Sequence, residues 1–431
     1  MFALVDGNNF YVSTECAFRP ALKTRPVVVL SNNDSSCIAR SNEAKALGIR
    51  MGAPWFECRQ LAEEHGVVAL SANFTLYGDM SNRMMSIAAG LGPSQEIYSI
   101  DESFIEMTGI RGNLVKRGQD VRERILQWIG IPTAIGIGPT KTLAKLANHV
   151  AKSADRKPGS YPAELARVCN LAALPASDLD AILQATDVAE VWGIGRHIAK
   201  QLHDENVMNV LQLIQIDAAT IRRRWSVVLE RTVRELQGQA SILLEDQPPP
   251  KQEIAYTRSF GQPVRSLFEL TQAVTEFASG AGAKLRLQGG LAGQINVFIH
   301  TSPFRNGPQY SNSAIVPLRR PTSDTPLLVQ AAVRGLEVIY RSGFDYIKAG
   351  VMLLDLQDGS VEQHELDLED EPQARGNLMS TMDRLNDRYG RGTVLLASAG
   401  LEGKKRSWAM RQELLTPEYT TRWADLPVAK A

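Results

Sequence analysis

Cysteine is scarce in this sequence of 431 residues, and the few cysteines do not form a pattern typical of metal or disulfide sites. The four are Cys16, Cys37, Cys58 and Cys169, with no CxxC pair among them. This spacing argues against a zinc site and against the disulfide framework of a small secreted domain. We expect all four to be reduced thiols in the core or at the surface.

Long apolar runs are also missing. No run is long enough to span a bilayer, and the N-terminal stretch MFALVDGNN reaches an acid at residue 6, before a signal-peptide core could form. We therefore expect a cytoplasmic protein that does not contact a membrane. With 44% hydrophobic and 22% charged residues, the composition is that of a globular chain long enough for two or more domains.

Net charge is the third absence, because 47 basic residues balance 47 acidic ones. Taken alone, this balance argues against a nucleic-acid partner. The acids are unevenly distributed, however: residues 355–371 carry eight acids and no Lys or Arg, which leaves 47 basic against 39 acidic residues elsewhere. The rest of the chain is mildly basic, so nucleic acid remains a possible partner.

The chain has no internal repeat, and its clearest linker is EDQPPPKQE at 245–253, where three prolines favour an extended connector. The part before it alternates strands and helices, which predicts a mixed α and β fold. We predict strands at 2–5, 26–30, 96–100, 103–107 and 132–138, helices at 41–48, 80–91 and 140–152, and only helix over 165–236.

Two adjacent acids interrupt the stretch YSIDESF at 98–104. Neighbouring side chains on a strand point to opposite faces, so Asp101 and Glu102 could not share a site within one strand. Two alternating runs separated by two residues are typical of a hairpin, although Asp-Glu is not a favoured turn pair. We therefore predict a hairpin whose tip is Asp101-Glu102, which would bring both acids to one edge of the sheet.

A third acid, Asp6, ends the first predicted strand and is followed by Gly7. If that strand lies beside the hairpin, three carboxylates cluster and need a counter-charge, which Mg²⁺ with its preference for oxygen ligands would supply. Two such ions about 3.5–4 Å apart are the recurring device of in-line phosphoryl transfer. The alternative is that these are exposed turn acids.

The predicted helix at 140–152 has an apolar stripe that we expect to be buried, formed by Leu143, Leu146, Ala147, Val150 and Ala151. Its lysines, Lys141, Lys145 and Lys152, lie on the opposite side, and Arg156 and Lys157 follow. This is either a solvated face, which is the commoner case, or a surface that neutralises a triphosphate or a DNA backbone. The preceding GIGPTKT does not have the spacing of a P-loop.

The stretch VWGIGRHIAKQL at 191–202 predicts a helix–hairpin–helix, with Ala199 and Leu202 facing inward. In such a motif Gly193 and Gly195 allow backbone amides at a helix N-terminus to approach a phosphate without sequence preference. A tight corner in a helical bundle is the alternative, and we favour binding to the DNA backbone, with Arg196 as part of that contact.

Five stretches occur in the order found in Y-family DNA polymerases, and the resemblance covers essentially the whole chain. They are MFALVDGNNFY, SNNDSSCIARSNEAKALGIRMG, YSIDESF, GIGPTKTLAKLANHVAK and VWGIGRHIAKQL. The sequence is most similar to the UmuC branch, with its MucB-, RumB- and RulB-like members. Further stretches that support this branch are PVVVLSNNDS, VLERTVRELQG, KAGVML and TPEYTTR.

The resemblance implies an α+β right-hand fold whose parts can be assigned by residue number. The palm would be 1–13 and 78–164, the fingers 14–77, the thumb with its helix–hairpin–helix 165–236, a linker 237–251, the little finger 252–350, and a UmuC-type C-terminal region 351–431.

Site residues also follow from the resemblance. Asp6, Asp101 and Glu102 would be catalytic and, with the Gly7 carbonyl, would hold two Mg²⁺ ions. Tyr11 falls at the position that excludes a 2′-hydroxyl, with Phe10 beside it in the substrate site, and Lys45 and Lys152 match positions that contact the incoming triphosphate.

The implied function is error-prone, Mg²⁺-dependent translesion DNA synthesis in the SOS response, by a DNA-directed DNA polymerase that binds primer–template DNA and dNTP. A processed UmuD-like dimer, RecA and the sliding clamp are the implied protein partners. Within the acidic stretch, Gln363, Leu366 and Leu368 have the spacing of a clamp-binding peptide. The alternatives are a nucleotide cyclase, a silent DNA-binding scaffold and a generic α/β phosphotransferase; for the acidic stretch, the alternative is a polar connector.

Overall fold

The computed structural model describes residues 1–245, 249–360, 373–390, 392–400, 406 and 408–428. The chain folds into two compact units. Unit 1 comprises residues 1–31, 35–248 and 414–431, and unit 2 comprises residues 32–34 and 249–413. The change from unit 1 to unit 2 after residue 248 falls inside the run of three prolines.

Unit 1 is built on a five-stranded sheet of order β5-β6-β1-β7-β8. Its central strand β1 is fully buried and pairs antiparallel with β6 and with β7. The strands are β1 Phe2–Gly7, β5 Gln95–Ile97, β6 Glu102–Glu106, β7 Thr133–Gly138 and β8 Val168–Asn170.

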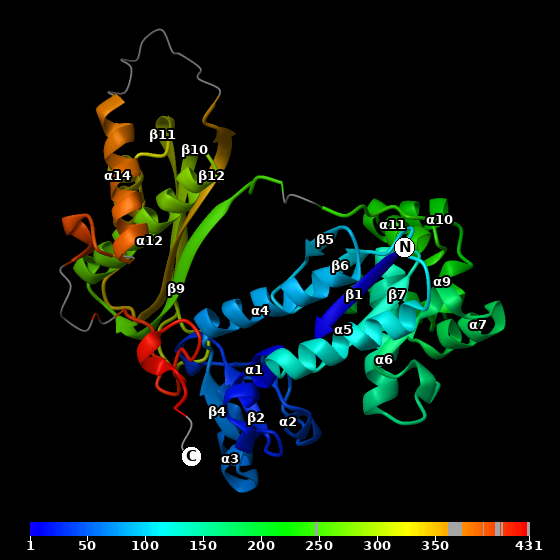
Figure 1. Cartoon of the computed structure of the whole chain (residues 1–431). Coiled ribbons are helices and arrows are strands. Elements are labelled where there is room, and N and C mark those ends of the chain that lie inside the picture. The colour runs from blue at the N-terminus through cyan, green and yellow to red at the C-terminus, as the bar shows by residue number, and fades with distance from the viewer. Residues whose placement is uncertain (246–248, 361–372, 391, 401–405, 407, 429–431) are drawn as a thin grey trace. The chain divides into compact units, whose positions relative to one another are not determined.

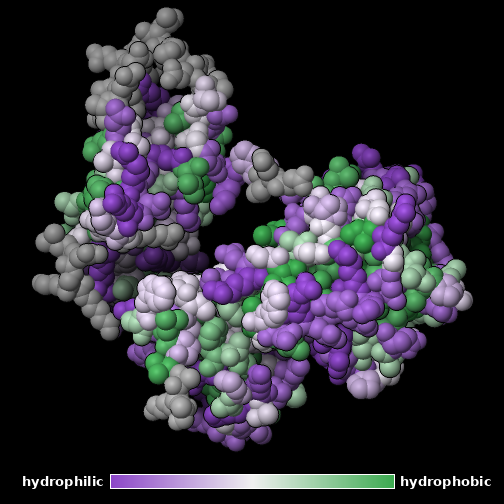
Figure 2. All heavy atoms as spheres, in the orientation of Figure 1, coloured by the Kyte–Doolittle hydropathy of each residue, from purple (hydrophilic) through white to green (hydrophobic). Residues whose placement is uncertain are grey.

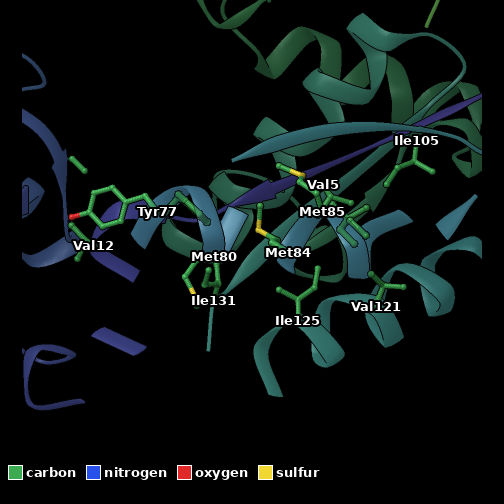
Figure 3. Packing of buried hydrophobic residues seen from close by; sticks show 14 of the residues in the cluster. Val5, Val12, Tyr77, Met80, Met84, Met85, Ile105, Val121, Ile125 and Ile131 are labelled. Carbon is green, nitrogen blue, oxygen red and sulfur yellow. The ribbon is translucent and has the colours of Figure 1, made fainter. Parts of the chain in front are cut away.

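Alternation along β1 separates its two faces. Ala3 and Val5 belong to a core shared with α4 Phe74–Ala88 and α5 Leu114–Ile129, whereas Phe2 and Leu4 pack on the other face with residues of α6 Lys141–Arg156. Figure 3 shows the first of these cores, with the methionines of α4 between sheet and α5 side chains. The labelled residues there include Val5, Met80, Met84, Met85, Ile105, Val121 and Ile125. By the same period of two, Asp6 lies on the α6 face.

Helix α6 lies unusually close to β7. A Cβ on Gly136 would be 2.2 Å from the carbonyl oxygen of Ala144, so only glycine fits at this position of the strand. The helix begins after Thr140, whose side chain accepts a hydrogen bond from the Leu143 amide. The close approach of α6 to Gly136 places the helix across the face of the sheet on which Asp6 lies.

Two further groups of elements complete unit 1. The first is a small sheet of order β3-β2-β4 with three helices: β2 Val27–Leu30, β3 Cys37–Arg40, β4 Val68–Ser71, α1 Phe10–Phe18, α2 Asn42–Ala46 and α3 Trp55–His65. The second is helical and shares a core with the apolar stripe of α6: α7 Ala176–Ala185, α8 Arg196–Asp204, α9 Val210–Ile214, α10 Ala218–Arg224 and α11 Val227–Leu236.

Unit 2 is an antiparallel four-stranded sheet of order β11-β10-β12-β9. Alternate residues of β10 are buried in a core that the sheet shares with α12 and α13. The elements are β9 Ile254–Val264, α12 Leu267–Leu287, β10 Gly290–Thr301, β11 Ser311–Thr322, α13 Thr325–Ile339, β12 Tyr346–Asp358 and α14 Gln373–Tyr389 (Figure 1).

The structure confirms the predicted mixed fold, the strands at 2–5, 26–30 and 132–138, and the helix at 140–152 with its buried apolar stripe. The prediction of helix throughout 165–236 is wrong, because β8 pairs in parallel with β7 at the sheet edge. A strand of three residues carries too short a pattern to be recognised locally. Helix α4 also starts earlier than residue 80, because Asn73 caps it.

Three domain boundaries expected from the resemblance fall inside an α-helix or a β-strand. Residues 13 and 14 both belong to α1, residues 77 and 78 to α4, and residues 350 and 351 to β12. Each of these elements is continuous across the expected boundary. The sheet of unit 2 therefore extends to Asp358, beyond the expected limit of the little finger.

On the face shown in Figure 2, much of the surface is hydrophilic, with apolar areas between the hydrophilic residues. In the part of the chain that the structure describes, no helix combines the length and apolar character needed to cross a bilayer.

Candidate active site

The stretch YSIDESF forms part of a hairpin, as predicted, because β5 and β6 pair antiparallel. The tip itself differs from the prediction: the connection is residues 98–101, and Glu102 is the first residue of β6. Ser99 shapes it. Its hydroxyl accepts hydrogen bonds from the amides of Asp101 (3.3 Å) and Glu102 (3.1 Å) and donates to Asp101 Oδ1 (2.7 Å). A serine turn thus replaces the unfavourable Asp-Glu turn.

Strand pairing brings the three predicted acids to one edge of the sheet. Asp6 and Glu102 are direct partners across β1 and β6, so their side chains share a face. The Gly7 amide donates to the Asp101 carbonyl oxygen at 2.8 Å, which fixes the hairpin tip against the end of β1. Neighbouring acids in sequence can therefore belong to one site, because one is in the tip and the other is in the strand.

Lysines of α6 provide the counter-charges. Lys152 forms an ion pair with Asp6, Lys145 Nζ lies 3.2 Å from Glu102 Oε2, and Lys141 Nζ lies 2.5 Å from Glu96 Oε2 on β5. These lysines do lie opposite the apolar stripe, but their reading as a solvated face is wrong for Lys141, which is 2% exposed. One side of α6 packs on helices and the other faces the acids of the sheet.

Burial dominates the electrostatics of Asp6. It raises the pKa of Asp6 to about 7; the positive charge of Lys152 opposes this shift, and the charges of Glu102 and Asp101 add to it. Because the charges of Glu102 and Asp101 raise the pKa of Asp6, a cation placed among the three carboxylates would offset their mutual repulsion. Among the described residues, no group of three or more acidic, histidine or cysteine side chains is arranged as a ready metal site. The all-oxygen donor set nevertheless fits Mg²⁺, and the lysines now occupy the place of that positive charge.

Further cations surround the predicted Lys45. Its ammonium group donates to Asn9 Oδ1 at 2.5 Å, and burial, followed by the charges of Arg156, Arg40 and Lys152, lowers the pKa of Lys45 to about 8. Within the described chain, the buried Nε of Arg40 has no hydrogen-bond partner. Such a cluster of cations with an unused donor suits an anionic ligand. Arg40 was not identified as a site residue from the sequence alone. Its position at the end of β3, shortly before Lys45 on α2, could have indicated that it lies near Lys45.

The two aromatic residues of the predicted substrate site behave differently. Tyr11 is half-buried and stacks on Tyr77 with ring centroids 4.5 Å apart; burial and the nearby charge of Asp101 raise the pKa of Tyr11. Phe10 is 3% exposed and lies in the core, where a Cβ on Gly7 would be 2.9 Å from its ring. The Phe10 ring packs beneath the Gly7 backbone, and its place in the substrate site stays a prediction.

The predicted phosphate-binding turn precedes α8. Gly193 has φ 88°, a conformation that favours glycine, and Gly195 is the N-cap residue of α8, directly before Arg196. Ala199 and Leu202 are buried, as predicted. The element before the turn is one 3-10 turn, Val188–Glu190, and not the expected α-helix. The predicted clamp-binding residues Gln363, Leu366 and Leu368 lie outside the described residues.

Models of known families match most of the chain. Residues 5–149 match the impB/mucB/samB family, residues 251–368 match the C-terminal domain of that family, and residues 376–429 match a domain of unknown function.

Curated relatives match along the full length. The chain is 43% identical to Protein ImpB of Salmonella typhimurium, with 100% of each chain covered, and 43% identical to Protein UmuC of Salmonella typhimurium strain LT2, with 99% of each covered. It is 41% identical to Protein MucB of Escherichia coli, covering 100% of this chain and 99% of that protein.

Solved structures support the same fold at lower identity. A chimera of the Y-family polymerases Dbh and Dpo4 aligns with a TM-score of 0.64 at 19% identity, covering 82% of this chain and 99% of the chimera. An insertion ternary complex of Dbh DNA polymerase aligns with a TM-score of 0.53 at 19% identity, covering 82% of this chain and 98% of Dbh. From the family models and the full-length relatives, the chain belongs to the ImpB/MucB/SamB family, the UmuC branch of the error-prone, translesion Y-family DNA polymerases.

Proposed function

We propose that the site formed by Asp6, Asp101 and Glu102 catalyses template-directed addition of a dNTP to a primer 3′-hydroxyl, including opposite damaged bases. The observation that carries this proposal is the register of β1 and β6, which places Asp6 opposite Glu102 and ties Asp101 to Gly7. The reaction forms a bond between the primer oxygen and the α-phosphorus, and pyrophosphate leaves.

Asp6, Asp101, Glu102 and the Gly7 carbonyl would hold two Mg²⁺ ions. When bound, these ions lower the pKa of the 3′-hydroxyl and neutralise the developing charge on the phosphates. The chain itself contributes positive charge for the triphosphate from Lys45 and Lys152, and we add Arg40 and Arg156 because their charges act on Lys45.

Tyr11 is our candidate for the residue that excludes ribonucleotides. Its ring is half-exposed, is supported from one side by Tyr77, and lies close enough to Asp101 for that charge to shift its pKa. A rigidly supported ring beside the acids would contact the sugar of an incoming nucleotide. Phe10, in contrast, supports the Gly7 backbone from the core.

The remaining expectations concern DNA, partners and location. We propose that the Gly193–Gly195 turn and Arg196 bind the DNA backbone, with the palm, fingers and thumb in unit 1 and the little finger in unit 2. We further propose that the protein acts in the cytoplasm during the SOS response, with a processed UmuD-like dimer and RecA as partners.

Primer extension on undamaged and abasic templates, with and without those partners, tests the proposed activity. Asp101→Ala should retain DNA binding and lose nucleotide incorporation, because it removes a carboxylate of the site. Asp120→Ala, at an exposed acid of α5, is the matched control and should leave extension unchanged. Extension by Asp101→Ala within about tenfold of the unaltered protein would contradict this assignment.

Binding to the sliding clamp through Gln363, Leu366 and Leu368 is a separate proposal. It rests on the spacing of these residues within an acidic stretch, which would hold the peptide away from DNA. Surface plasmon resonance with the clamp should show weaker binding for the triple alanine variant. Equal affinities would leave this stretch as a polar connector.

A further inference from the structure

Residues 414–422 lie in the part of the chain whose family model is a domain of unknown function, yet they belong to unit 1. In Figure 1 this C-terminal segment, in red, lies beside the blue elements that include α1 and β4. It extends the edge of the small sheet: β4 is an edge strand, the Ser71 amide donates to the Leu414 carbonyl at 3.0 Å, and the Leu414 amide donates to the Ser71 hydroxyl at 3.0 Å.

Asn73 connects this segment to helix α4. Its side-chain oxygen accepts from the Leu76 amide and so caps the helix, while its Nδ2 contacts Thr416 O (3.1 Å), Thr416 Oγ1 (3.3 Å) and Pro417 O (3.2 Å). Asn73 is 2% exposed, so these contacts satisfy a buried amide. The start of α4 is therefore built partly from the C-terminal segment.

Thr416 also reaches a buried acid on α1. Its hydroxyl donates to Glu15 Oε1 at 3.0 Å, and the Tyr77 hydroxyl donates to the same oxygen at 2.7 Å. Glu15 and Tyr77 are fully buried, and Thr416 is nearly so. A buried carboxyl group is costly unless it accepts hydrogen bonds, so this three-residue contact is tightly constrained.

Tyr77, whose hydroxyl is held by Glu15, packs directly against Tyr11. The two rings stack with an interplanar angle of 17°, and Phe74, also on α4, meets Tyr11 edge-on at 6.0 Å. Figure 3 shows Tyr77 beside Val12 at one end of the core, with its hydroxyl directed away from Met84. A second stack, Tyr419 on Phe18 with centroids 4.7 Å apart, holds the segment against the far end of α1.

We propose that residues 414–422 position the sugar gate: Thr416 orients Glu15, Glu15 orients Tyr77, and the Tyr77 ring sets the position of Tyr11. The inference rests on the proposed function in taking Tyr11 as the residue that contacts the sugar. Thr416, Glu15 and Tyr77 are positioning residues, since none of them needs to touch a nucleotide. The function assigned to the segment is thus selectivity for the incoming nucleotide.

The test compares single hydroxyl deletions in the full-length protein. Thr416→Val removes both the donor to Glu15 and an acceptor for Asn73, while Thr416→Ser retains the hydroxyl. Thr420→Val is the matched control, because the buried Thr420 hydroxyl in the same segment has no hydrogen-bond partner among the described residues. The readouts are the ratio of ribonucleotide to deoxyribonucleotide incorporation and hydrogen exchange of α1. Tyr11→Ala is the reference variant, which removes the proposed gate entirely.

Thr416→Val should raise the incorporation ratio at least about threefold and speed exchange in α1, because small displacements of a positioned group have large effects on rate. Thr416→Ser and Thr420→Val should match the unaltered protein. An unchanged ratio in Thr416→Val, with a raised ratio in Tyr11→Ala, overturns the inference. If Tyr11→Ala also leaves the ratio unchanged, the gate proposal fails, and exchange in α1 decides: faster exchange in Thr416→Val alone supports the positioning role, and equal exchange overturns it.

Discussion

At the scale of single residues, the site depends on how the negative charges of its carboxylates are balanced. Asp6 is buried beside two other carboxylates, and burial raises the pKa of Asp6 because its ionised form is poorly solvated there, although the charge of Lys152 opposes the shift. Lys152 and Lys145 supply the opposing charges from α6. Tyr11 differs in kind, because its proposed role is steric and depends on where its ring is held.

Replacing Tyr11 tests that steric role. Tyr11→Ala should raise ribonucleotide relative to deoxyribonucleotide incorporation by on the order of tenfold or more, since pocket shape alone supplies discrimination of that size. Tyr11→Phe keeps the ring and should retain selectivity. Single-nucleotide incorporation kinetics measure both ratios, and an unchanged ratio in Tyr11→Ala would assign the gate to another residue.

Glu15 gives a prediction of pH dependence. Burial raises the pKa of Glu15 above its ordinary 4.5, and hydrogen bonds from Tyr77 and Thr416 and the charge of Arg19 oppose the shift only in part. The folded protein therefore binds the Glu15 proton more tightly than the unfolded chain does. The stability that Glu15 contributes through this difference is fully present below its unfolded-state pKa, and it is lost as the pH rises through its folded-state pKa.

Glu15→Gln cannot lose that proton. Its melting temperature relative to the unaltered protein should therefore increase as the pH is raised from about 5 to about 8. Differential scanning calorimetry at several pH values measures the difference, from which all shared titrating groups cancel. A difference that stays constant or falls with pH would contradict the inferred shift.

At the scale of elements, α6 holds the site together. Its apolar stripe packs on helices of unit 1, its backbone lies against Gly136, and its lysines meet acids on three different strands. The periodicity of 140–152 predicts the helix and the stripe. It does not predict that the opposite side is also covered, because a lysine on a solvated face and a lysine paired with a buried acid occupy the same helical positions.

Removing Glu96 would leave Lys141 buried without its ion pair. Glu96→Ala should lower the free energy of unfolding by about 3–5 kcal/mol, the usual cost of breaking a buried pair. Asp120→Ala breaks the exposed pair with Lys116, whose side chains are 54% and 69% exposed, and should cost about 0–1 kcal/mol. Urea denaturation measures both values; equal effects would mean that Lys141 finds another partner.

At the scale of the whole molecule, unit 1 is completed by two separate parts of the chain. Residues 1–248 supply most of it, apart from residues 32–34, and residues 414–431 return to it after unit 2. Glu15 accepts a hydrogen bond from the Thr416 hydroxyl, and the Asn73 side chain donates one to the Thr416 carbonyl oxygen. Without that segment, each of these buried polar groups loses a partner, at a cost of about 1–3 kcal/mol.

A fragment of residues 1–248 should therefore be less stable alone than with a synthetic peptide of residues 412–428. The peptide should raise the urea midpoint in a concentration-dependent manner, because it binds the folded fragment only. A peptide carrying Thr416→Val should be a weaker stabiliser. No effect of either peptide would show that the segment contributes little to the stability of unit 1.

What the sequence determined by itself is local. The apolar run FALV predicts β1, the apolar stripe between residues 143 and 151 predicts α6, and YSIDESF predicts a hairpin that carries two acids, because strand and helix patterns are properties of neighbouring residues. Tertiary structure alone decided the lysine–acid pairs, the burial of Phe10, the part played by Arg40 and the contact of Thr416 with Glu15. Those depend on which distant segments meet, and residues 15 and 416 share no local pattern that could reveal their contact before the chain folds.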